Sequence, residues 1–260
     1  MPSLISIAAT ASLLFAAQAY AHGYVQEVTL GSTKYTGYLP YSDPYYSTPP
    51  QRIIRKIPGN GPVEDVTSID VQCNGWSAGG VVGSAPAPIY GTVAAGATVN
   101  FNWTEWPESH AGPMLTYMAR APSDITKWNP GKEQVTADGA TPNRSVVWFK
   151  IDQSGKDSSG RWAAADKLVA NGGIYSIKIP AKLKPGQYII RHEILALHAA
   201  WTYPGVQVYP SCIQVEVTGS GTALPTSFVS FPGAYTPTTP GIVYDVYTNT
   251  GEYPLPGPAV

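Results

Sequence analysis

The sequence has few charged residues and no excess of either sign. Asp, Glu, Lys and Arg make up only 13% of its 260 residues, and the formal net charge is −1. Without a basic excess, the chain has no electrostatic footprint for nucleic acid and no polybasic patch for an anionic membrane. We therefore expect neither nucleic acid nor a membrane as a partner. A surface rich in Tyr, Ser, Thr and Asn suits a neutral, polar partner outside the cell.

The sequence also has few segments that could form long helices. Its 26 Gly and 25 Pro residues break or weaken helices, whereas a hydrophobic fraction of 43% is enough for a folded core. One segment, 161–170, looks helical. Short β-rich runs between Gly- and Pro-rich turns indicate strands, with strict apolar–polar alternation over 99–104. These runs are 24–30, 97–104, 114–120, 146–151, 174–179, 187–195 and 206–217. The pattern predicts an all-β fold: an antiparallel, immunoglobulin- or fibronectin-like β-sandwich with long loops and one short helix.

No charged side chain precedes His22. Residues 4–17 are almost wholly apolar or small, too short a run to cross a bilayer as a mature helix. They lead to Ala19-Tyr20-Ala21, a small-x-small cleavage site. This predicts a signal peptide at 1–21 and a secreted, extracellular protein of one domain at 22–260. Cleavage after Ala21 makes His22 the first residue, whereas cleavage after Ala19 leaves Tyr20 first.

Only two cysteines are present, Cys73 and Cys212, too few for a cysteine-rich metal site. In an oxidising compartment, a disulfide between them is the default expectation. Two Asn-x-Ser/Thr motifs predict glycosylation at Asn102 and Asn143. Asn102 has the polar parity of its strand, which leaves room for a sugar.

The predicted new N-terminus gives His22 unusual chemistry. A free α-amine has a pKa of about 7.7–8.0 and can ligate a metal at mild pH. This amine and the imidazole Nδ1 of His22 can chelate one ion, and a second imidazole completes a T-shaped set of nitrogens that suits Cu(II). His110 lies in a loop bounded by Pro107 and Pro113, where functional residues gather, although a loop histidine can equally fill a turn.

The other histidines, His192 and His198, do not fit the spacing of a zinc protease. That motif needs His-Glu-x-x-His on one helical face, but the residue four after His192 is Ala196. In a strand, His192 fits a structural role and His198, near the strand end, is the better candidate for chemistry. Gln207 and Tyr209 alternate and share one face. A phenol there could lie axial to copper and an amide could hold an oxygen species, although a polar cross-strand pair is also common.

Taken in order, these motifs resemble the fungal lytic polysaccharide monooxygenases of auxiliary activity family nine, once classed as glycoside hydrolase family sixty-one. The similarity spans the predicted mature chain. It is carried by the start at His22-Gly23, the loop 109–113, the segments 191–198 and 207–212, and the tail 253–258.

The resemblance implies a role for each residue. His22 and His110 would form a copper histidine brace with one copper ion per chain, and Tyr209 would lie on its axial side. His198 and Gln207 would hydrogen-bond the oxygen co-substrate, which makes His198, Gln207 and Tyr209 the expected catalytic set. The other implied roles are a flat substrate face carrying Tyr45 and Tyr253, and the family's shared disulfide between Cys73 and Cys212.

The expected function is therefore that of a secreted, monomeric copper monooxygenase or peroxygenase. It would use O2 or H2O2 and an external electron donor to cleave β-1,4-glucan, mainly cellulose, by oxidation at C1 or C4. A non-catalytic carbohydrate-binding or copper-carrying β-sandwich is the main alternative. A glycoside hydrolase is the weaker one, because it needs two carboxylates about 5–9.5 Å apart and no such pair is evident.

Overall fold

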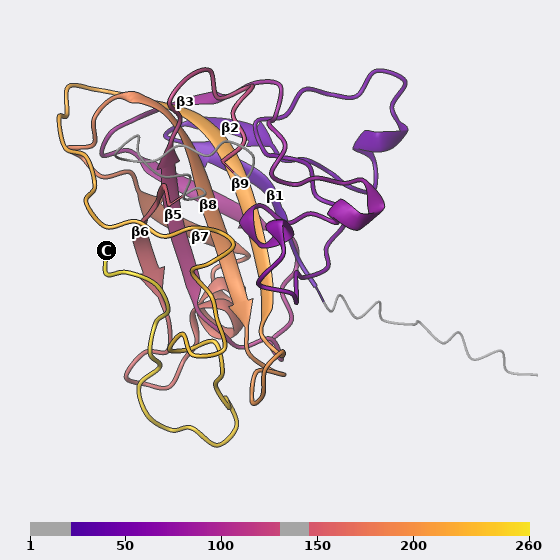
Figure 1. The fold of residues 1–260 in the computed structure, drawn as a ribbon, viewed down its shortest axis with the longest axis vertical. Coiled ribbons are helices and arrows are strands. Elements are labelled where there is room, and N and C mark those ends of the chain that lie inside the picture. The colour runs from indigo at the N-terminus through magenta and orange to yellow at the C-terminus, as the bar shows by residue number, and fades with distance from the viewer. Residues whose placement is uncertain (1–21, 131–145) are drawn as a thin grey trace, which may run out of the picture.

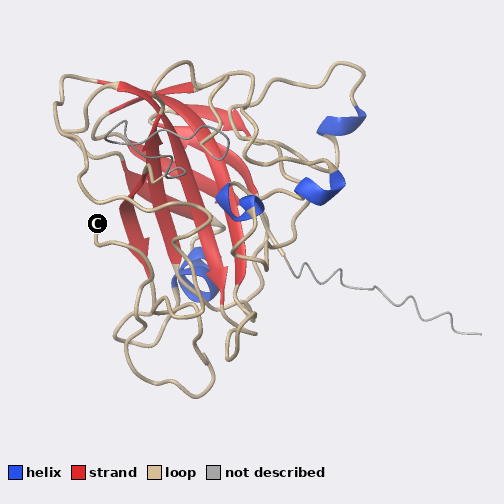
Figure 2. Cartoon of the chain, in the orientation of Figure 1, coloured by secondary structure: helices blue, strands red, loops and turns tan. Residues whose placement is uncertain are grey.

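The computed structural model describes residues 22–130 and 146–260. The predicted signal peptide at 1–21 and the predicted glycosylation site Asn143 lie outside the described residues. The chain folds into two β-sheets that pack face to face (Figure 1). Figure 2 shows that strands and long loops dominate and that the helices are short. The predicted all-β sandwich is confirmed.

The first sheet has the strand order β2-β1-β4-β7 and is antiparallel throughout. Its strands are β1 (Val25–Leu30), β2 (Thr33–Thr36), β4 (Thr98–Trp103) and β7 (Ile174–Lys178). The second sheet has the order β3-β9-β8-β5-β6. Its strands are β3 (Gly91–Ala94), β5 (Met114–Arg120), β6 (Trp148–Ser154), β8 (Gly186–Ala196) and β9 (Gln207–Thr218).

The strand pairs of the sandwich are antiparallel except at one edge. Strand β3 runs parallel to β9, with Gly91 opposite Val215 and Ala94 opposite Thr218. Strands β4 to β8 lie between β3 and β9 in the chain, so no hairpin forces this pair to be antiparallel. Neither β2 nor β3 was predicted, because each is only four residues long.

The core between the sheets follows from the alternation in the sequence. In β4, every second residue is buried: Val99, Phe101 and Trp103 face the other sheet. Strands β5, β8 and β9 are buried along almost their whole length, so they are covered on both faces. A second hydrophobic cluster covers the outer face of these strands.

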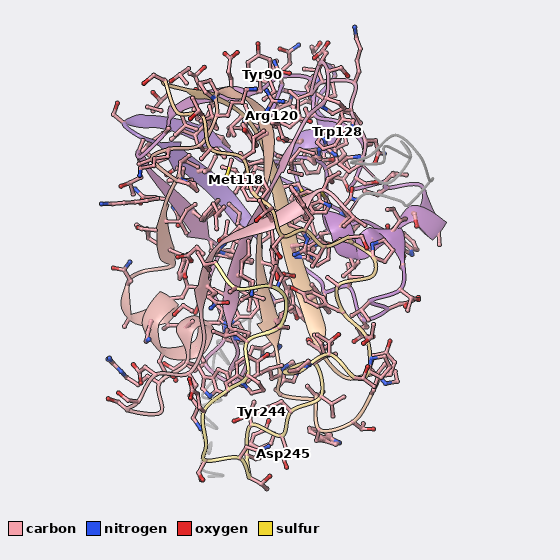
Figure 3. The ribbon with its side chains drawn as sticks, turned by 60° about the vertical axis from the view of Figure 1, so that its left-hand side comes forward. Tyr90, Met118, Arg120, Trp128, Tyr244 and Asp245 are labelled. Carbon is pink, nitrogen blue, oxygen red and sulfur yellow. A yellow bond between two sulfur atoms is a disulfide. The ribbon has the colours of Figure 1, made fainter. Side chains whose placement is uncertain are left out.

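That second cluster is closed by the C-terminal segment after β9, drawn in yellow in Figure 1. Its apolar side chains Phe231, Tyr235 and Ile242 are almost fully buried against the sheet. Figure 3 shows Tyr244 and Asp245 of this segment at the opposite end of the molecule from Arg120, the last residue of β5. The C-terminal segment is therefore part of the fold and reaches the end where β8 stops.

The described part of the chain has four short helices, all of them in loops. Three are 3-10 helices, at Asp43–Tyr45, Ile69–Gln72 and Ser77–Gly79. The fourth, a π-helix at Ala163–Leu168, lies within the predicted helical segment. None of the helices within residues 22–130 and 146–260 has the length and apolar character needed to span a bilayer.

The predicted disulfide is present. Cys73 and Cys212 are bonded with their Cα atoms 5.2 Å apart, and both are fully buried. The bridge joins the end of the second 3-10 helix to the middle of β9.

Candidate metal centre

The first described residue, His22, is held beside the end of β4. The backbone N–H of Thr104 donates to the carbonyl of Tyr24 at 2.9 Å, and the N–H of Tyr24 donates to Thr104 Oγ1 at 3.1 Å. A side chain in place of Gly23 would press on Thr104 and on the Trp106 ring, each 3.1 Å from an added Cβ. The start of the predicted mature chain therefore packs closely against the loop that carries His110.

The loop carrying His110 is fixed by its own backbone contacts. An added Cβ at Gly112 would lie 1.8 Å from the carbonyl oxygen of Leu195, so only glycine allows this approach to β8. Trp106 is buried and its Nε1–H donates to the carbonyl of His110 at 3.1 Å. These contacts bring the His110 ring to 5.8 Å from the His22 ring, measured between centroids, at an angle of 89°.

The hydrogen bonding of His110 leaves one nitrogen for a ligand. Its Nδ1 lies 3.0 Å from Ser109 Oγ, so Nε2 is the nitrogen not used in that contact. Burial, followed by the nearby imidazoles of His198 and His22, lowers the pKa of His110 to about 4. The ring is therefore neutral near pH 7, as metal coordination requires.

Tyr209 closes the interior side of the pair. Its ring lies 5.9 Å from the His22 ring and 4.9 Å from the Trp106 ring, and it is 1% exposed. Its hydroxyl donates to Gln207 Oε1 at 2.8 Å. Both side chains come from β9 and share one face, as the alternation predicted.

His198 follows β8 and stacks near His110, with ring centroids 3.9 Å apart. Its Nδ1 is buried and has no hydrogen-bond partner among the described residues, whereas the side chain as a whole is half-buried. Its carbonyl accepts from the Tyr247 hydroxyl at 3.3 Å. The structure therefore brings together His22, His110, His198, Gln207 and Tyr209, all of which the sequence analysis selected.

The donor set fits a single ion held by nitrogen. With metal–nitrogen bonds of about 2.0 Å and about 1 Å more from each nitrogen to its ring centroid, one ion between two imidazoles separates the centroids by about 6 Å. The observed 5.8 Å is compatible with this. Across 22–130 and 146–260, no three His, Cys, Asp or Glu side chains form a group that could hold a metal. The α-amine that the predicted cleavage would create at His22 could supply a further nitrogen.

The sequence is similar to a known family of proteins. Residues 22–253 match the family Auxiliary Activity family 9 (formerly GH61). The chain belongs to Auxiliary Activity family 9. It is 55% identical over 244 residues to AA9 family lytic polysaccharide monooxygenase B of Gloeophyllum trabeum, covering 92% of this chain and 91% of that protein. It is 54% identical over 251 residues to AA9 family lytic polysaccharide monooxygenase B of Malbranchea cinnamomea, with 96% of each chain covered.

Solved structures of AA9 members share the fold. The extended catalytic domain of H. jecorina LPMO9A has a TM-score of 0.79 and 32% identity, covering 92% of this chain and 90% of that one. A structure described as a cellulose-active polysaccharide monooxygenase from M. thermophila has a TM-score of 0.73 and 31% identity, covering 92% of this chain and 98% of that one. The resemblance inferred from the motifs is confirmed.

The zinc-protease motif is absent from the structure as well, because residues 191–196 lie in strand β8. His192 is fully buried between Phe101 and Tyr175, with Nδ1 2.9 Å from Thr116 Oγ1. Its neighbour Glu193 is fully buried and paired with Arg191. Both belong to the core.

One predicted substrate-binding residue, Tyr253, is buried. Tyr253 is only 3% exposed, and its hydroxyl donates to the carbonyl of Gly241 at 2.7 Å. It packs at 5.1 Å from Trp162, so it cannot present its ring to a sugar, and the prediction was wrong. Of the four tyrosines after β9, three are buried and only Tyr247 is exposed, and the sequence does not show which of them turn inward. Tyr45 is 83% exposed, so its ring is accessible, and its role in substrate binding stays a prediction.

The sequence analysis also missed residues around the site. Trp201 and Tyr247 are 57% and 69% exposed, with ring centroids 6.4 Å apart, next to His198. Asn60 Nδ2 donates to the carbonyl of His22 at 3.4 Å, and Glu64 accepts from Gln207 Nε2 at 3.2 Å. The only signal for Asn60 and Glu64 was their place in the long loop 36–65.

Proposed function

We propose that the mature protein starts at His22 and is a secreted copper-dependent monooxygenase, or peroxygenase, that cleaves β-1,4-glucan chains, mainly cellulose, at C1 or C4. The observation that carries this proposal is the perpendicular pair of imidazoles from His22 and His110, 5.8 Å apart, in a member of AA9. The description of the M. thermophila relative as cellulose-active supports the substrate class.

The ligands would be the α-amine and Nδ1 of His22 and Nε2 of His110. Copper bound there would supply one-electron redox chemistry: it would take an electron from an external donor and activate O2 or H2O2, so that a hydrogen atom can be removed from a glucose carbon. The Ser109 contact orients the His110 ring, and the buried Tyr209 ring limits access from the interior side.

The remaining residues act on the co-substrate and the glucan. His198 and Gln207 would hydrogen-bond a small oxygen species. Both side chains are half-buried, the His198 ring lies 3.9 Å from the His110 ring, and Gln207 accepts from the Tyr209 hydroxyl. Exposed aromatic rings, Tyr45 with Trp201 and Tyr247, provide faces on which the apolar side of a glucose ring can stack.

The alternatives predict different products. A hydrolase would release unmodified oligosaccharides, and Glu193 cannot serve it because it is fully buried and paired with Arg191. A carbohydrate-binding or copper-carrying protein would release no product.

The test is mass spectrometry of soluble products from cellulose treated with copper-loaded protein starting at His22, in the presence of ascorbate. Aldonic acids or C4-keto sugars are expected. His110→Ala should remove copper binding and product together, and a form that retains Ala21 should lose the chelating amine. Unmodified sugars, or oxidised sugars from the His110→Ala form, would contradict the proposal.

A further inference from the structure

Behind Tyr209, a chain of two side-chain hydrogen bonds leads away from the site to an acidic residue. The Tyr209 hydroxyl donates to Gln207 Oε1 at 2.8 Å, and Gln207 Nε2 donates to Glu64 Oε1 at 3.2 Å. Glu64 lies at the surface, on a loop far from β9 in sequence. None of the expected roles includes it.

The backbone fixes the position of Glu64. The neighbouring residue, Val63, forms an antiparallel bridge with Val208, with N–H···O distances of 2.8 and 3.0 Å. Both valine side chains are buried in the outer hydrophobic cluster. Because neighbours in an extended chain point to opposite faces, Glu64 and Gln207 meet on the other side of this bridge.

The direction of these two hydrogen bonds follows from which groups can donate and which can only accept. An ionised carboxylate can only accept, so the end of the Gln207 amide that faces Glu64 is its NH2 group. The carbonyl end then faces Tyr209, which must donate its hydroxyl hydrogen to it. Because the phenol acts as the donor in that hydrogen bond, the lone pairs on its oxygen are not used by it. Without an acceptor at residue 64, the amide could rotate and reverse the direction.

We propose that Glu64 is a positioning residue for the metal centre: its carboxylate sets the orientation of the Gln207 amide and thereby the hydrogen-bond direction of the Tyr209 hydroxyl beside the His22–His110 pair. The inference rests on the proposed function, because it assumes that copper binds at that pair. The same loop also reaches the other side of the centre, since Asn60 donates to the carbonyl of His22. The loop that carries Asn60 and Glu64 therefore contacts both His22 and Gln207, the hydrogen-bond partner of Tyr209.

The neighbouring residue offers a matched control. Asp65 is also exposed and lines the same pocket of about 640 Å³ as Glu64 and Gln207. Its carboxylate instead accepts from the backbone N–H and the hydroxyl of Thr67, at 2.9 and 2.6 Å. Asp65→Ala therefore removes the same charge from nearly the same place without touching the Gln207 amide. Glu64→Gln removes the charge but retains an oxygen that can accept from Gln207.

The test is the electron paramagnetic resonance spectrum of the Cu(II)-loaded protein, with copper stoichiometry by titration calorimetry and the melting temperature of each metal-free variant. Glu64→Ala should bind one copper and melt like the wild type, but its copper hyperfine splitting should shift. Its rate of product formation should fall by about tenfold, as is common when a hydrogen-bonding partner behind a metal site is removed. Glu64→Gln and Asp65→Ala should each give the wild-type spectrum.

Two results would overturn the inference. One is a wild-type spectrum for Glu64→Ala, and the other is an equal shift in Glu64→Ala, Glu64→Gln and Asp65→Ala, which would indicate a charge effect. Failure of the proposed function is distinguishable, because the wild-type protein would then bind no copper or release no oxidised sugar.

Discussion

Replacing Cys73 and Cys212 together by alanine should remove a large share of the free energy of unfolding. The bridged residues are 139 apart in sequence. For a loop of that length, the loss of chain entropy in the unfolded state corresponds to about 5 kcal/mol at 25 °C. Since domains are stabilised by only about 5–15 kcal/mol in total, the variant should be close to unfolding at moderate temperature.

The assay is reversible urea unfolding, supported by thermal scans. At about 2–4 °C per kcal/mol for a domain of this size, Tm should fall by about 10–20 °C. The wild type in the presence of a reductant is the control, because reduction opens the loop without removing atoms from the core. A loss below about 1 kcal/mol in both the variant and the reduced wild type would refute the chain-entropy reasoning.

Further predictions concern the core and the site. Burial, reinforced by the charge of Arg191, lowers the pKa of His192 to about 3. The unfolded state therefore binds more protons as the pH falls from about 6.5, and this residue should cost about 3 kcal/mol of stability by pH 4. In urea unfolding, the loss of stability between about pH 7 and pH 4 should be about 3 kcal/mol smaller for His192→Leu than for the wild type. Tyr253→Phe should cost about 1–2 kcal/mol in urea unfolding, because it leaves the buried carbonyl of Gly241 unpaired, and should not change cellulose binding in a pull-down assay. Tyr45→Ala should do the reverse, with stability within about 0.5 kcal/mol and weaker cellulose binding, because its ring is exposed. Trp106→Phe should keep an aromatic ring but lose the hydrogen bond to the His110 carbonyl and part of the buried indole, which together cost about 2–3 kcal/mol in urea unfolding and weaken copper binding in calorimetry.

Much of the architecture was predictable because it depends on local pattern. The strict alternation over 99–104 indicated a strand buried on one face, and β4 has that burial. The predicted strand at 114–120 coincides with β5, and the helical segment at 161–170 contains the observed helix. The disulfide needed only a count of cysteines and an oxidising compartment. The motifs around His22, His110 and Tyr209 were sufficient to indicate the family, which the comparisons then showed.

The remaining features depend on contacts between residues far apart in the chain, for which a linear pattern carries no signal. The parallel pairing of β3 with β9 brings Gly91 beside Val215. Tyr45 is exposed and Tyr253 is buried, although both lie in similar Pro- and Tyr-rich segments, because Tyr253 packs into the outer hydrophobic cluster whereas Tyr45 lies in a 3-10 helix outside it. The hydrogen bond from Gln207 to Glu64 joins residues 143 apart. Local residue types determine which segments form strands, but packing and hydrogen bonding between those segments determine which side chains meet at the metal centre.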